Sequence, residues 1–129
     1  MKTAGRILFG VVAGMTLAFA LVVAIEVFSA VLHPMPANLI GGVPEHVRRY
    51  PHWILAVAAL AWAATIAAST WAATRIGGRP AGIIMALLLA WALIFNLTML
   101  PYTLWFKVAM SVALPITCVL GIKFGKRAR

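Results

Sequence analysis

The stretch from Ile7 to Leu32 is the feature that most restricts how this chain can fold. Its 26 residues carry a single charged side chain, Glu26, set well inside the apolar run. At about 1.5 Å per residue, a helix of this length crosses the roughly 30 Å hydrocarbon core of a bilayer with room to tilt. A carboxylate at that depth costs a few kcal/mol or more, so the fold must either satisfy Glu26 or use it.

Composition extends this interpretation to the whole chain. Of the 129 residues, 64% are hydrophobic and 10% are charged, whereas soluble domains carry about 25% charged residues. Further apolar runs lie at about 53–74, 81–100 and 103–122. We therefore expect one transmembrane domain over residues 1–129, an all-α bundle of four transmembrane helices. The outer loop 33–52 is rich in proline and glycine, which predicts that no regular helix crosses it.

The basic residues predict the orientation of the spans. Eight of the eleven lysines and arginines lie on the side of both termini, and three lie on the side of the outer loop. By the positive-inside rule, we expect a multi-pass protein of the bacterial cytoplasmic (inner) membrane with both termini in the cytoplasm. The chain has a net charge of +9, but it has no basic face with interleaved aromatic residues, so nucleic acid is not an expected partner.

Three polar residues fall in one slice of the predicted bilayer. Glu26, Asn96 and Lys107 lie about 10, 9 and 8 Å above the midpoints of their spans. In a structural interpretation, Glu26 pairs with Lys107 and hydrogen-bonds Asn96, or Lys107 reaches the outer surface and leaves Asn96 as the only partner. In a functional interpretation, lipid favours the neutral carboxyl, and Glu26 binds or releases a proton.

Two residues extend this polar slice toward the outer surface. Ser29 and His33 follow Glu26 by three and seven residues and share its helix face. The line they form is either a path for protons or ions or the polar seam of a packed helix.

The three histidines, His33, His46 and His52, are the candidates for a metal or haem site, because imidazole binds zinc, copper and haem iron. All three lie in the outer loop without the close spacing of a zinc motif. Residues placed like His33 and His52 are more often interface residues that flank spans, and we expect neither a bound metal nor another cofactor.

Small residues recur every four positions in the first span, at Gly10, Gly14 and Ala18. Such rows let helix backbones approach closely in lipid. The expected partners are therefore membrane lipids and either further copies of this chain or other integral membrane subunits. Trp62 and Trp91 lie mid-span, where tryptophans more often fill the core, although the two could also flank a quinone, haem or pigment ring.

The chain resembles a broad group of small, four-span bacterial membrane proteins that have no assigned activity. The resemblance rests on the late glutamate of span one, the exit His33-Pro34-x-Pro36, the tryptophan of span two, and Asn96 followed by Pro101 and Leu104-Trp105-Phe106. Small multidrug transporters also combine four short spans with a glutamate in the first, but theirs lies nearer the middle of the span. They serve here as an analogy.

No catalytic set is visible, because no serine, histidine and acid share one slice and no glycine-rich phosphate loop follows a strand. We expect a non-enzymatic assembly or accessory subunit of a larger membrane complex or homo-oligomer. The alternative is a small proton- or cation-coupled transporter or channel with Glu26 as the protonatable site.

Overall fold

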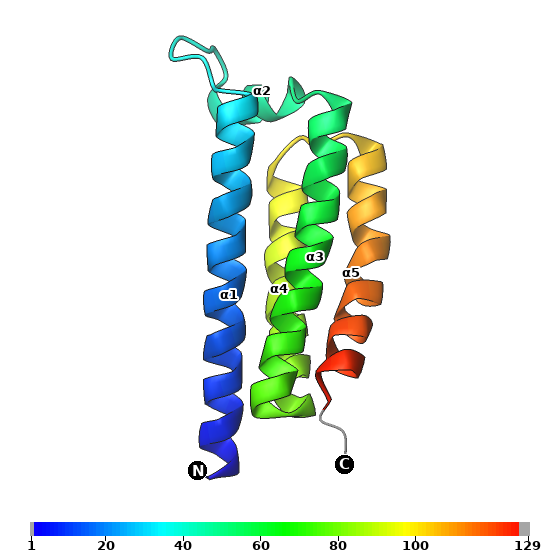
Figure 1. Cartoon of the computed structure of the whole chain (residues 1–129). Helices are drawn as coiled ribbons and strands as arrows, with labels where there is room; N and C mark the ends of the chain where they lie inside the picture. Colours follow the sequence, from blue (N-terminus) through cyan, green and yellow to red (C-terminus); the bar gives the residue numbers. More distant parts are fainter. Residues whose placement is uncertain (1, 127–129) are drawn as a thin grey trace.

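The computed structural model describes residues 2–126, and this part of the chain is helical without strands. Four long helices, α1 (Thr3–Leu32), α3 (His52–Gly77), α4 (Arg79–Met99) and α5 (Leu104–Gly125), stand side by side (Figure 1). Each is long and apolar enough to cross a membrane. The predicted all-α, four-span architecture is confirmed, and these helices mark the chain as a multi-pass membrane protein.

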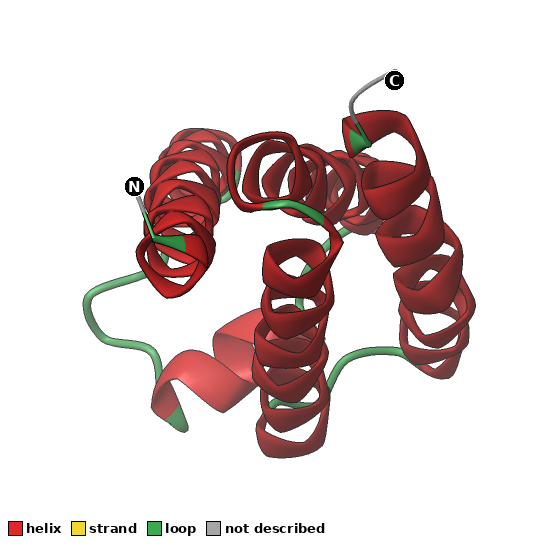
Figure 2. Ribbon diagram, turned by 90° about the horizontal axis from the view of Figure 1, so that it is seen from below, coloured by secondary structure: helices red, strands yellow, loops and turns green. Residues whose placement is uncertain are grey.

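The central helix of the bundle is α3. It packs against α1 on one side and α5 on another, while α4 contacts all three, as the view along the bundle shows (Figure 2). By contrast, α1 and α5 make no contact with each other. The described ends of the chain lie together at one end of the bundle, which we call the terminus end; the opposite end is the loop end (Figure 1).

Glycine and proline set the breaks between helices. Gly78 alone separates α3 from α4, and its φ of 84° is one that glycine adopts without steric cost. Pro80 then lies in the first turn of α4, where its missing N–H leaves no helical bond unmade. Pro101 follows the end of α4, and Pro115 lies within a continuous α5.

The loop between α1 and α3 contains a helix that the sequence did not predict. This helix, α2 (Gly42–Arg48), has seven residues and lies across the loop end of the bundle (Figure 1). Gly41 and Gly42 turn the chain into it with φ values of 96° and 64°. The expectation of a loop without regular helix was wrong over this part, because Pro44 falls in the first helical turn, where proline is tolerated.

The small-residue row of α1 faces α3. Gly10, Gly14 and Ala18 are buried, and a Cβ on Gly10 would lie 2.6 Å from the Gly77 nitrogen and 2.7 Å from the Ala73 oxygen. The two backbones therefore approach as closely as glycine allows. This row is occupied within the bundle and is not a free surface for another subunit.

Candidate functional site

Two cavities meet at Glu26, near the loop end of α1. The first, which we call the loop-end cavity, has a volume of about 400 Å³ and lies between α1, α2, α3 and α4, with Phe106 of α5 also in its wall. The second, the deep cavity, has a volume of about 200 Å³ and lies closer to the terminus end, between α1, α3 and α4. The residues that line both cavities are Glu26, Trp62 and Asn96. The three side chains thus form the boundary between the two spaces.

Two of these boundary side chains carry buried polar atoms with no hydrogen-bond partner within residues 2–126, Trp62 Nε1 and Asn96 Oδ1. Trp62 is held by aromatic neighbours, with ring centroids 6.2 Å from Tyr102 and 5.8 Å from Phe106, both edge-on. An unpaired buried donor or acceptor costs about 1–3 kcal/mol. A fixed indole N–H and an amide oxygen beside a carboxylate are suited to bind a polar ligand or water.

The structure brings some of the predicted polar residues together and separates others. Glu26, Ser29 and Asn96 all line the loop-end cavity, and Ser29 is buried on α1. Lys107 lines neither cavity, and residues 2–126 contain no ion pair that involves Glu26. The pairing of Glu26 with Lys107, one of the two alternatives for this lysine, does not form, because Lys107 lies on α5 and α5 makes no contact with α1.

His33 ends the polar line that follows Glu26, but it does not line the cavity. It caps α1, and its backbone N–H donates to the Ser29 oxygen at 2.8 Å. Its ring stacks on His46, with centroids 4.8 Å apart and planes 9° from parallel. His46 is buried and does line the loop-end cavity. The line from Glu26 therefore reaches α2 through this histidine pair.

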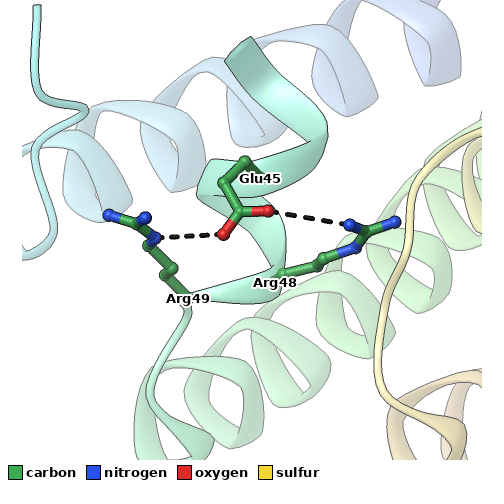
Figure 3. Close-up of polar contacts among 3 residues, drawn as sticks. All are labelled: Glu45, Arg48 and Arg49. Atoms are coloured by element: carbon green, nitrogen blue, oxygen red, sulfur yellow. Dashed lines mark hydrogen bonds and ion pairs between the residues drawn. The ribbon is translucent and has the colours of Figure 1, made fainter. Parts of the chain in front are cut away.

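The roof of the loop-end cavity comes from α2, through residues such as His46 and Val47. On its exposed side, Glu45 forms ion pairs with Arg48 at 3.6 Å and Arg49 at 3.2 Å (Figure 3). Exposed pairs of this kind contribute about 0–1 kcal/mol, so they support the short helix without fixing it. The roof is thus held mainly by its buried residues.

Burial lowers the pKa of His46 below its ordinary value, and the charge of His33 lowers it further. The imidazole of His46 therefore favours its neutral state. His52 lies apart at the start of α3, where its Nδ1 accepts a hydrogen bond of 2.8 Å from Trp105 Nε1. The three candidate metal ligands are thus divided between two places. Residues 2–126 contain no group of three histidine, cysteine or acidic side chains that could hold a metal ion.

Both tyrosines of the chain line the loop-end cavity, and the sequence reasoning missed them. Tyr50 follows α2, and Tyr102 lies between α4 and α5. Burial raises the pKa of each phenol, and the negative charge of Glu26 raises it further. Their position beside the ends of spans, where amphipathic aromatic residues concentrate, was the signal that could have found them.

The proposed pair of tryptophans around a ring-shaped ligand does not form. Trp62 lines both cavities, whereas Trp91 is 71% exposed on the bundle surface and stacks on Phe95. Trp91 lines neither cavity. The aromatic residues that do surround the site with Trp62 are Tyr50, Tyr102 and Phe106.

No family model, curated protein or solved structure matches the chain. The site is therefore interpreted from its own residues.

Proposed function

We propose that this chain is a small multi-pass transport protein in which Glu26 exchanges a proton for a small cation drawn from the loop-end cavity. One observation carries the proposal: the carboxylate of Glu26 lies at membrane depth, borders two cavities, and has no ion pair within residues 2–126. Intramembrane carboxylates are expensive and mark ion and proton pathways.

The surroundings of Glu26 favour a cation over other ligands. Tyr50, Trp62 and Tyr102 line the same cavity, and aromatic faces attract cations through the negative charge of the ring face. Asn96 Oδ1 is an unpaired acceptor in the same wall. A carboxylate, an amide oxygen and aromatic rings together supply the contacts that a dehydrated cation requires.

The proposal includes an orientation in the bacterial cytoplasmic membrane, with both termini in the cytoplasm. It is supported by the sequence, in which eight of eleven basic residues lie in the segments on the side of both termini and three on the side of the outer loop. In this orientation, the loop-end cavity faces outward and is the entry site for the cation.

The test compares Glu26→Gln with Glu45→Gln, because these two glutamates are the only acidic residues of the chain. Purified protein in weakly buffered detergent is titrated with sodium, potassium and tetramethylammonium chloride, and released protons are read with a pH dye. We expect proton release from wild type and from Glu45→Gln with one of these salts, and none from Glu26→Gln. Equal release from both variants, or none from wild type, would contradict the proposal.

A second candidate function, an assembly or accessory subunit, is favoured by a different observation. Glu26 is exposed on the bundle as a single chain, and lipid beside a carboxylate is unfavourable. A second copy or another subunit that covers α1 would remove this cost. Native mass spectrometry tests it: a homo-oligomer or a co-purified subunit supports assembly, whereas a monomer that releases protons supports transport alone.

A further inference from the structure

The roof of the loop-end cavity is attached to the bundle by side chains and not by backbone packing. Within residues 2–126, the backbone of α2 makes no close contact with α1, α3, α4 or α5. The ion pairs of Glu45 join it to Arg48 and Arg49 of the same short segment, so they do not hold the roof on the bundle. Gly41 and Gly42 precede the rest of α2 with positive φ, where glycine changes conformation at little steric cost. The roof can therefore rotate about these glycines once its side-chain contacts are lost.

A cluster of three rings joins α2 to the end of α1: His33, His46 and Tyr50. The two imidazole centroids lie 4.8 Å apart with planes 9° from parallel, and the Tyr50 ring lies 5.1 Å from each of them. His33 directly follows α1, whereas His46 lies in α2 and lines the cavity. The contact that holds the roof thus contains two side chains of the type that titrates near neutral pH.

The stacked pair does not accommodate two positive charges. His46 is 8% exposed, and Nε2 of His33 is buried with no hydrogen-bond partner within residues 2–126. Burial lowers the pKa of His46, and the charge of His33 lowers it further, although a hydrogen bond with the His33 backbone acts in the opposite direction. With both rings protonated, like charges would face each other across the stack, and the Nε2–H of His33 would be kept from water.

Other charged or titratable groups surround the pair in the roof and in the cavity wall. They are Glu26, Glu45, Arg48, Arg49, Tyr50 and Tyr102. The carboxylate of Glu45 is paired with both arginines. Glu26 raises the pKa of the two tyrosines, which therefore stay neutral between pH 5 and 8, but it does not contribute to the lowered pKa of His46. The two histidines are thus the groups through which acid acts on the contact between α1 and α2.

We propose that protonation of His33 and His46 releases α2 and opens the loop-end cavity to water. The two charges repel each other across the stack, and each imidazolium is hydrated once the roof has moved. At neutral pH the stack keeps the roof in place, and acid shifts the population to the open state, because the open state binds protons more readily. This inference concerns access to the cavity and is independent of what Glu26 binds.

The test is a distance measurement by double electron–electron resonance on the full chain in lipid nanodiscs. Spin labels are attached at Val43→Cys in α2 and Leu104→Cys at the start of α5, both exposed positions, with the only native cysteine removed by Cys118→Ser. The ratio of open to closed distances is compared at pH 8 and pH 5.5. We expect it to rise at least about fourfold in acid, the factor that corresponds to two unit charges 4.8 Å apart even at the dielectric constant of water.

Histidine and glutamate variants assign the response to the stack. His33→Phe and His46→Phe each remove a proton site but keep a ring in the stack, so neither should show the rise. His52→Phe is the matched control, because this third histidine lies outside the stack at the start of α3; it should respond as wild type does, as should Glu26→Gln and Glu45→Gln. No change in wild type, a wild-type response in the stack variants, or a lost response in any of the other three would overturn the proposal. If one stack variant fails to fold, the other decides the result.

Discussion

The contact between α1 and α3 makes Gly10→Ala the sharpest test of the packing described here. The new Cβ would lie 2.6 Å from the Gly77 nitrogen, 2.7 Å from the Ala73 oxygen and 2.7 Å from the Gly77 Cα. All three are backbone atoms, so no side-chain rotation relieves the contact and the helices must separate. Overpacking of this kind costs about 1–3 kcal/mol, and alanine regains at most about 1 kcal/mol of helix propensity. We expect a net loss of about 1–2 kcal/mol.

The assay is unfolding of the purified protein in mixed micelles by titration with sodium dodecyl sulfate, followed by circular dichroism. Val12→Ile is the matched control, since it also adds one carbon to α1 but at a side chain that is 51% exposed on the bundle surface. We expect Gly10→Ala to unfold at lower detergent fraction and the control to match wild type. If Gly10→Ala unfolds with or after wild type, the close backbone approach is wrong.

Three further changes test other parts of the molecule. The pKa of His46 is lowered in the folded state, so as pH falls below the ordinary value of 6.5 the unfolded state binds the proton first. The free energy of unfolding should therefore decrease as pH falls below 6.5. His46→Phe should flatten this decrease in melting curves recorded between pH 5 and 8. Trp105→Phe removes the hydrogen bond to His52 and should cost about 0.5–1 kcal/mol in the same melts. Asn96→Leu replaces an unpaired oxygen at a cavity wall with an apolar side chain. It should raise the free energy of unfolding by about 1 kcal/mol and abolish cation-driven proton release. A melting temperature below that of wild type would contradict the stability prediction.

The four spans could be predicted because each is a long apolar run that ends at proline, glycine or charged residues. The runs at about 53–74 and 81–100 correspond to α3 and α4, although α3 continues through Gly77 and only Gly78 breaks the chain. Hydropathy predicts the length of the apolar part of a span well, but it does not predict how short the connection between two helices is. The helix α2 was missed for a related reason: proline was treated as a general helix breaker, whereas its effect depends on its position in the helix.

The site could be predicted in part. Depth along each span placed Glu26 and Asn96 in one slice, and both line the two cavities. The same depth argument placed Lys107 in this slice, but Lys107 lines neither cavity, because depth says nothing about which helices are neighbours. That α3 and α4 stand between α1 and α5 is a property of packing, set by close contacts such as that of Gly121 with Thr70. No periodicity within a single span encodes this order.

The unpaired atoms around Glu26 bear on the choice between a structural and a functional carboxylate. A polar network that only locks helices together is most stable when every donor and acceptor in it is matched. Here Trp62 Nε1 and Asn96 Oδ1 are buried without partners in the walls that Glu26 also lines, at a cost of about 1–3 kcal/mol each. That cost is recovered when a polar occupant enters the space between them. These unpaired atoms support the proposal of an exchange site over a fixed seam between helices, with Asn96 Oδ1 as the acceptor available to a cation.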